Sequence, residues 1–408
     1  MRILWICPTL LHPTINGSQI RTLGILRHLS RKNEIHFVGT ARHGQTTDQK
    51  DEYCSVAYAF PLQPPARGSL AFAVDAFLNL FSPIPLYVAR YASRPARECV
   101  KRLLRDNTYD VLVVDFLLSV PNLPASRLEN AVLFQHNVEA RIMGRLAAET
   151  ASRPRRAYLS YMARRVEQYE KAACSRVRHV ITVSASDSAY IAKHYGVNAT
   201  SIPTGVNVRH FERPAGVSPD AASPDAPHSD LVFIGSMDYL PNIQGVHWFV
   251  ERVLPLIHAR RPATTVALVG KYPDSSIQAL AVKDSRIRVT GTVPDVRPYL
   301  WNAEASIVPL LAGSGTRLKI YEAMAAGVPV ISTALGAEGL AYTDGTDIVL
   351  ASDPESFAAA CLDLLEHRGR RDSIAQAGHA LVKSRFDWSA VAEEFQGILE
   401  RALASSRP

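Results

Sequence analysis

The sequence predicts an α/β protein made of two doubly wound, Rossmann-like domains. Short apolar runs alternate with amphipathic helical patterns through the first half of the chain, which is typical of a parallel sheet covered on both faces. A stretch rich in Pro, Ala, Ser and Asp at residues 214–230 interrupts this alternation, which then starts again. The 408 residues are enough for two domains with full cores.

In the first half, six apolar runs are expected to be strands, and four stretches show helical periodicity. The expected strands are residues 3–6, 35–38, 56–60, 111–115, 131–135 and 180–183. The expected helices are residues 20–29, 96–104, 156–174 and 185–194.

In the second half, the expected strands are residues 231–237, 264–270, 287–291, 305–310, 328–332 and 347–351. Helices are expected at residues 246–256, 316–326, 354–365 and 373–395. The predicted organisation is a domain at 1–205, a linker at 206–230, a second domain at 231–385 and a C-terminal helix at 386–408.

Charge is divided unequally between the two halves. Residues 1–210 contain 27 Lys and Arg against 15 Asp and Glu, whereas the rest of the chain is acidic. An anionic partner is therefore expected, and an anionic membrane surface is favoured over nucleic acid because no nucleic-acid-binding pattern is present. Scattered cysteines and the lack of a long apolar run predict a cytoplasmic protein with neither a disulfide framework nor a zinc site.

The most informative segment is residues 313–333, GSGTRLKIYEAMAAGVPVIST. Gly313 and Gly315 flank Ser314, so the backbone there is expected to adopt a positive φ and to come close to a ligand, and Thr316 is a candidate helix cap. Unpaired N–H groups at a helix start favour an anion. The cations Arg317 and Lys319 at the same end oppose the helix dipole, which a bound phosphate would explain. Solvated surface cations beside an ordinary glycine loop are the alternative.

The string EAMAAGVPV, which begins at Glu322, resembles the donor-site segment of family 4 glycosyltransferases, which have the GT-B fold. The signature of this family is E-x7-E. Glu322 matches its second Glu, and the resemblance implies that this residue binds the ribose of a nucleotide sugar. The first Glu, which contacts the donor sugar in the family, is replaced by Ser314.

A second departure from the family concerns the diphosphate. Many members carry an Arg and a Lys after the glycine that corresponds to Gly235, whereas this chain has Ser236 and Gln244 near those places. We expect Arg317 and Lys319 to replace this clamp, since the diphosphate charge still needs cations. The combination of MDYLPN and GTRLK resembles a bacterial subgroup associated with exopolysaccharide and exosortase systems.

Other candidate site residues follow expected strands. Gly17 and Ser18 precede a helix and resemble the family's glycine turn, and Arg21 lies one turn further on. His136 follows the strand at 131–135, and the resemblance implies that it contacts the donor sugar or the acceptor. Asp115 is a weaker acceptor-side candidate, and it is equally suited to capping a turn.

Three further residues complete the predicted site. Gly205 lies in IPTGV, which resembles the turn through which the family's chain enters the cleft between the domains, and a plain hinge is compatible with that role. Backbone groups at Gly291 and Val293 are expected to flank the nucleobase. The C-terminal helix would cross back to the first domain, as in GT-B enzymes.

The resemblance implies a retaining glycosyltransferase that uses a nucleotide-diphosphate sugar, with UDP- and GDP-sugars favoured, and needs no metal or cofactor. A glycan or lipid-linked acceptor is expected. The alternatives are a sugar-nucleotide epimerase on the same fold and a non-catalytic sugar-nucleotide-binding protein.

One apolar and aromatic stretch, residues 70–91, is followed by a run of basic residues that begins at Arg90. Together with the basic residues 153–165, it is interpreted in two ways. The first is a buried helix pair with a solvated basic face, and the second is an amphipathic surface that faces a membrane beside the acceptor site.

Overall fold

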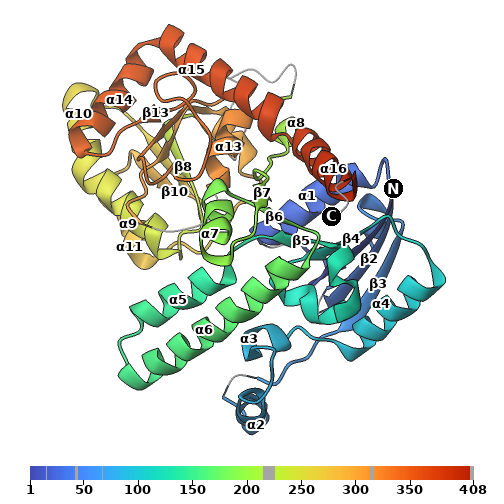
Figure 1. The fold of residues 1–408 in the computed structure, drawn as a ribbon. Coiled ribbons are helices and arrows are strands. Elements are labelled where there is room, and N and C mark those ends of the chain that lie inside the picture. Colours follow the sequence, from blue (N-terminus) through green and yellow to red (C-terminus); the bar gives the residue numbers. More distant parts are fainter. Residues whose placement is uncertain (15, 42–44, 67, 215–225, 313–316, 405–408) are drawn as a thin grey trace. The chain divides into compact units, whose positions relative to one another are not determined.

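The computed structural model describes residues 1–14, 16–41, 45–66, 68–214, 226–312 and 317–404. The chain forms two compact units (Figure 1). Unit 1 contains residues 1–203 and 391–408, and unit 2 contains residues 204–390.

Unit 1 is built on a seven-stranded parallel sheet in the order β3-β2-β1-β4-β5-β6-β7. Its strands are β1 (Arg2–Cys7), β2 (Glu34–Ala41), β3 (Val56–Pro61), β4 (Val111–Asp115), β5 (Ala131–Gln135), β6 (His179–Thr182) and β7 (Ala199–Ser201). The order reverses between β1 and β4, which makes the carboxyl ends of these two strands the topological switch point.

The helices of unit 1 connect these strands. They are α1 (Gly17–Leu29), α2 (Leu70–Asn79), α3 (Leu86–Ala89), α4 (Arg94–Asp106), α5 (Glu139–Glu149), α6 (Arg153–Arg176), α7 (Ala185–Tyr195) and part of α16 (Trp388–Ala404). Short 3₁₀ turns lie at Lys50–Glu52, Leu117–Asn122 and Ala125–Asn130.

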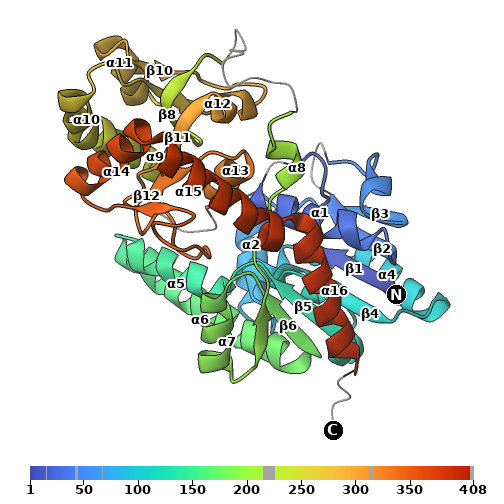
Figure 2. The ribbon, with the colours of Figure 1, turned by 90° about the horizontal axis from the view of Figure 1, so that it is seen from above.

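The last helix belongs to the core of unit 1 from Val391 onward (Figure 2). Phe395 of α16 is fully buried, and its ring lies 5.6 Å from Trp5 of β1 and 5.1 Å from Phe134 of β5. A segment nearly 400 residues from the start of the chain thus covers the first strand. Aromatic burial of this kind contributes several kcal/mol, on the order of 3–5 for truncation of one ring.

Unit 2 has a six-stranded parallel sheet in the order β10-β9-β8-β11-β12-β13. Its strands are β8 (Ser229–Ile234), β9 (Val266–Val269), β10 (Ile287–Val289), β11 (Ala303–Val308), β12 (Val330–Ser332) and β13 (Val349–Leu350). The order reverses between β8 and β11, which places a second switch point at their carboxyl ends.

The helices of unit 2 are α8 (Val208–Phe211), α9 (Leu240–Trp248), α10 (Leu254–Arg260), α11 (Ser275–Lys283), α12 (Arg297–Trp301), α13 (Leu318–Ala325), α14 (Pro354–Glu366) and α15 (Arg368–Leu381). Single π-helical turns at Phe249–Val253 and Val382–Phe386 follow α9 and α15. The two doubly wound sheets confirm the predicted fold class.

The boundaries differ from the prediction at two places. Part of the expected linker is structured, since α8 and the start of β8 lie within residues 206–230. The helix expected at 373–395 is interrupted, because Phe386 stacks on Tyr321 at 4.5 Å and Asp387 accepts a hydrogen bond from the Val208 N–H. These contacts hold the chain in unit 2 before α16 begins.

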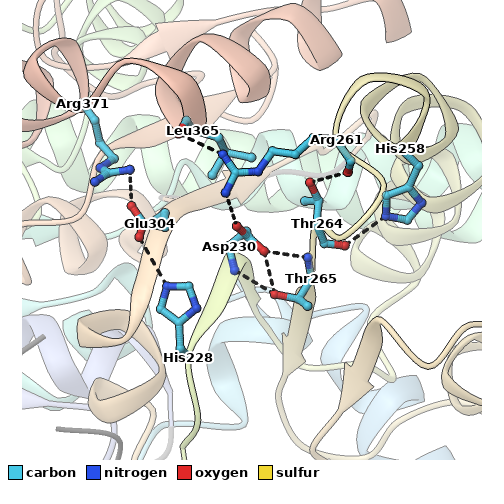
Figure 3. Close-up of polar contacts among 9 residues, drawn as sticks. All are labelled: His228, Asp230, His258, Arg261, Thr264, Thr265, Glu304, Leu365 and Arg371. Carbon is cyan, nitrogen blue, oxygen red and sulfur yellow. Dashed lines mark hydrogen bonds and ion pairs between the residues drawn. The ribbon is translucent and has the colours of Figure 1, made fainter. Parts of the chain in front are cut away.

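At the amino ends of β8 and β9, a polar network joins the strands to the helices beside them (Figure 3). Asp230 accepts hydrogen bonds from Arg261 Nη2 at 3.0 Å and from the Thr265 N–H and hydroxyl at 2.8 Å each. Arg261 also donates to the Leu365 carbonyl at 3.0 Å. This network lies at the end of the sheet opposite the switch point, so its role is to hold the sheet and the helices together.

Candidate donor site and the buried polar chain of unit 1

The switch point of unit 2 brings together two segments that the sequence singled out. Gly235 and Ser236 directly follow β8, and Lys319 and Glu322 lie in α13, which follows the neighbouring strand β11. Gly313, Ser314, Gly315 and Thr316 lie outside the described residues. Arg317 occupies the position just before α13 and is 7% exposed.

Lys319 lies directly against the loop after β8. Its Nζ donates to Asn242 Oδ1 at 3.1 Å and lies 4.4 Å from the centre of the Phe233 ring. A Cβ placed on Gly235 would be 2.8 Å from this Nζ and 2.8 Å from Asn242 Nδ2. Residue 235 is therefore a glycine because the lysine ammonium and the amide fill the space of a side chain.

Burial affects the protonation of this cation. Burial, together with the nearby charge of Arg317, lowers the pKa of Lys319 to about 7, and Glu322 opposes this shift. A lysine whose pKa lies close to the pH of the solution gains a proton readily when an anion binds beside it. The site thus places the Arg317 guanidinium near an amine, Lys319, whose charge is expected to respond to a ligand.

Glu322 lies one turn after Lys319 on α13. Burial raises the pKa of its carboxyl group, and Lys319 partly offsets this effect. Within the described residues, the Glu322 side chain makes no hydrogen bond or ion pair. A desolvated carboxylate without partners is costly, and it is suited to accept hydrogen bonds from ligand hydroxyl groups.

Asn242 connects the two segments and was not predicted as a site residue. Its Nδ2 donates to the Ser236 carbonyl at 2.8 Å while its Oδ1 accepts from Lys319. The Ser236 hydroxyl donates to Asp238. The only signal in the sequence was a polar residue in the first turn of the helix after β8, which is weak by itself.

The remaining predicted residues of unit 2 lie in different surroundings. Gly291 has a φ of +70°, which requires a glycine-like backbone, and Val293 lies half-buried two residues later. At Gly205, a Cβ would be 2.5 Å from the Trp388 ring, so close packing accounts for this glycine. Their contact with a donor stays a prediction.

In unit 1, the switch point brings Arg21, Asp115 and His136 into one buried chain. Arg21 Nη1 lies 3.1 Å from His136 Nδ1, and His136 Nε2 lies 2.8 Å from Asp115 Oδ1. Asp115 Oδ2 accepts hydrogen bonds from Trp5 Nε1 at 3.1 Å and from the Thr22 hydroxyl at 2.8 Å. Arg21 lies in α1 and Asp115 is the last residue of β4, whereas His136 directly follows β5.

This geometry fixes the tautomer of His136. Arg21 can only donate, so Nδ1 accepts and the ring proton is on Nε2, which donates to Asp115. Burial lowers the pKa of His136, in agreement with a neutral ring, and Phe116 stacks on it at 3.9 Å. Both ring nitrogens are engaged and the residue is 3% exposed, so the geometry favours positioning of Arg21 over direct substrate contact.

Gly17 and Ser18 form the first turn of α1 rather than a loop before it. Asn16 caps this helix, with its side chain accepting from the Gln19 N–H at 3.0 Å and from the Ser18 hydroxyl at 2.6 Å. Arg21 lies one turn further on, 7% exposed, and burial lowers its pKa to about 10. A helix start and a cation therefore lie at the same end of the sheet.

Comparisons with known proteins agree with this fold. Residues 15–210 match the model of Glycosyltransferase Family 4, and residues 228–367 match that of Glycosyl transferases group 1. The phosphatidyl-myo-inositol mannosyltransferase of Mycolicibacterium smegmatis is 28% identical over 222 residues, which are 50% of this chain and 52% of that protein. The chain thus spans about half the length of the curated relatives it matches.

Two solved structures cover nearly all of the chain. Sucrose-phosphate synthase from Thermosynechococcus elongatus aligns with a TM-score of 0.66 and 18% identity over 100% of both chains. Anabaena Alr3699/HepE in complex with UDP aligns with a TM-score of 0.65 and 13% identity over 98% of this chain and 100% of that one. At these identities the likeness concerns the fold. The two parallel-sheet units of this chain, together with the two family models that it matches, show that it has the GT-B fold of the group 1 and family 4 glycosyltransferases.

Proposed function

We propose that this protein is a glycosyltransferase that moves a sugar from a nucleotide-diphosphate sugar to a glycan or lipid-linked acceptor. The observation that supports it best is the position of Lys319, whose ammonium group lies against Gly235 at the switch point of unit 2. Ligands of open α/β sheets bind at such points.

The diphosphate of the donor would lie between the loop after β8 and the start of α13. Arg317 and Lys319 supply the cations that Ser236 and Gln244 do not. As the bond between sugar and phosphate weakens, negative charge grows on the leaving diphosphate, and preorganised cations stabilise that charge. This arrangement supports transfer without a metal ion, which we include in the proposal.

Glu322 would accept hydrogen bonds from the ribose hydroxyl groups of the donor. Its carboxylate has no partner within the described residues, and ribose offers two hydroxyl donors at one edge. Because hydrogen bonds to the ionised form favour it, ribose binding would lower the raised pKa of Glu322. UDP- and GDP-sugars are the favoured donors.

The chain Asp115–His136–Arg21 would act on the acceptor side. Asp115 holds the neutral His136 ring, and this ring in turn orients the Arg21 guanidinium at the start of α1. A cation beside helix N–H groups suits an acceptor that carries phosphate. The name of the mycobacterial relative, a phosphatidyl-myo-inositol mannosyltransferase, supports a lipid acceptor. Retention of configuration and a role in exopolysaccharide synthesis at the cytoplasmic face complete the proposal.

Donor binding is the first test. Thermal shift and calorimetry with UDP-, GDP- and dTDP-sugars should show selective stabilisation of the wild type, and both Glu322→Ala and Arg317→Ala should lose it. Retention is tested by the anomeric NMR signals of the product, and metal independence by turnover in EDTA. Binding of no nucleotide sugar, or affinity unchanged in both variants, would contradict the donor site.

The absence of the first signature Glu favours a second candidate, a protein that binds a nucleotide sugar without transferring it. Ser314 stands where the family has the carboxylate that contacts the sugar. An epimerase on this fold would need acidic groups around the sugar, which Ser314 does not provide. Donor binding without slow hydrolysis, transfer or epimerisation would favour the binding protein.

A further inference from the structure

Helix α2 of unit 1 presents a large apolar surface to solvent. Residues 68–82 contain one charged residue, Asp75, and no cation. Six large apolar side chains in this segment are between 43% and 82% exposed: Leu70, Val74, Phe77, Leu78, Leu80 and Phe81. Figure 1 shows α2 at the margin of unit 1, beyond α3. A contiguous apolar surface of this kind is unusual in a protein that has no partner for it.

Hydrogen bonds at both ends of α2 hold this apolar surface in a defined position. The Ser69 side chain caps α2 by accepting from the Phe72 N–H at 3.1 Å. At the other end, Asn79 is buried, and Arg165 of α6 donates to its carbonyl at 3.0 Å and its side chain at 3.1 Å. Arg165 also donates to the Ser82 carbonyl. The helix is thus fixed with its apolar side chains outward.

The same contacts join α2 to the most basic part of unit 1. Residues 151–166, the start of α6, contain five Arg and no Asp or Glu. Arg153, Arg155, Arg156 and Arg164 are exposed, and so are Tyr158 and Tyr161, at 44% and 45%. A cationic surface with two tyrosines therefore adjoins an apolar surface.

We infer that α2 and residues 151–166 form one membrane-docking face for a bilayer that contains anionic lipids. Phe77, Phe81 and their neighbours would enter the boundary between headgroups and acyl chains, and the arginines would bind lipid phosphates. Tyrosine suits the interface because its ring is apolar and its hydroxyl polar. A second copy of the chain is a poorer occupant, because a two-fold contact of this face would place arginines near arginines.

This inference rests on the proposed function in one respect: the docking face would serve the transfer reaction only if the acceptor is linked to a lipid. None of the described helices is long and apolar enough to cross a bilayer, and peripheral docking requires no such helix.

Vesicle sedimentation tests the docking face without donor or acceptor. The full-length protein should bind vesicles of phosphatidylglycerol and phosphatidylcholine, bind less in high salt, and bind poorly to phosphatidylcholine alone. We expect Phe77→Ser/Phe81→Ser and Arg155→Gln/Arg164→Gln each to lower the partition coefficient about tenfold or more. Phe77 and Phe81 are 62% and 80% exposed and pack against each other, and Arg155 and Arg164 are exposed as well. Folding, measured by circular dichroism, should therefore be unchanged in both variants.

Two control variants make the same chemical changes elsewhere. Leu256→Ser/Val282→Ser removes exposed apolar groups of unit 2, and Lys283→Gln/Arg288→Gln removes two exposed cations of the same unit. Both should keep wild-type vesicle binding. No binding by the wild type, or equal loss in docking and control variants, would overturn the inference. The inference would also be overturned if the wild type were a dimer that does not bind vesicles and the Phe77→Ser/Phe81→Ser variant were a monomer. Since donor binding is measured separately, a failed sedimentation assay would leave the transferase proposal intact.

Discussion

Gly235 and Lys319 are packed so closely that the ammonium group of one occupies the space a side chain would need on the other. An alanine Cβ at residue 235 would lie 2.8 Å from Lys319 Nζ and would have to displace it. We predict that Gly235→Ala weakens donor binding about tenfold or more, because the cation and Asn242 lose their positions. Calorimetry with the nucleotide sugar found by screening would measure this change.

Gly144→Ala is a suitable control for that substitution. Gly144 lies in α5, and a Cβ there would meet no atom within 4 Å. Alanine should leave the stability unchanged or raise it by roughly 0.5–1 kcal/mol without an effect on donor binding. Equal donor affinities of Gly235→Ala and the wild type would refute the proposed role of Lys319.

Donor binding should be linked to proton uptake through Lys319. The free protein holds the pKa of this lysine at about 7, and a bound diphosphate would raise it. Above pH 7 the lysine must therefore gain a proton on binding, so affinity should fall with rising pH, by at most about tenfold per unit. Calorimetry at pH 8 in two buffers of different ionisation enthalpy would reveal the uptake. Lys319→Gln should abolish it, and an unchanged uptake in this variant would assign the proton to another group.

A buried carboxyl group in unit 1 should lower stability at neutral pH. Burial raises the pKa of Glu139 to about 7 from an ordinary value of 4.5. The folded state then binds more protons than the unfolded state between these values, so the free energy of unfolding falls as pH rises through them. In Glu139→Gln, the side chain can still accept the hydrogen bond from the Tyr87 hydroxyl group. The free energy of unfolding of this variant should be higher than that of the wild type by up to about 3 kcal/mol at pH 8 and by less at pH 5.

Denaturant unfolding at both pH values would measure this difference. Glu129→Gln, an exposed substitution in the same unit, serves as the control and should change stability by less than about 0.5 kcal/mol. A gain of stability that is the same at pH 5 and pH 8 would exclude the titration of Glu139 as its cause.

Asp230 should matter for stability and not for donor binding. Asp230→Ala leaves Arg261 and the Thr265 N–H without their shared acceptor, which should cost about 2–4 kcal/mol in the free energy of unfolding. The residue lies at the amino ends of the strands, away from the switch point, so nucleotide-sugar affinity should be unchanged when the variant is folded. A selective loss of affinity would place the donor elsewhere than proposed.

The strands at 111–115 and 131–135 were predicted to the residue because a polar side chain closes each fully apolar run. The range of helix α5 was not predicted, and the residue at its N-cap position, Val138, makes no side-chain hydrogen bond to the helix start. Glu170 of α6 accepts instead from the N–H groups of Glu139 and Ala140, at 2.9 and 3.1 Å, a contact that spans about thirty residues. A local pattern does not contain such a partner.

In the candidate site, too, local sequence features were predicted and long-range contacts were not. Lys319 was identified from its place at a helix start, Glu322 and His136 from the family resemblance, and Arg21 and Asp115 from their positions near strand ends. Their connections were not foreseen, because Asn242 meets Lys319 across 77 residues and Arg21 meets His136 across 115. Residue type and strand order predict which groups gather at a sheet edge, whereas hydrogen-bond partners depend on packing.

The return of α16 to unit 1 also bears on how such proteins exchange parts. The chain leaves unit 1 near Pro203 and re-enters it at Val391. A single crossover between two related genes would therefore join one parent's Trp5 to the other parent's Phe395. A functional chimera that receives a new unit 2 needs two junctions, or a matching final helix, so these modules should be inherited as an insertion rather than as a simple tandem fusion.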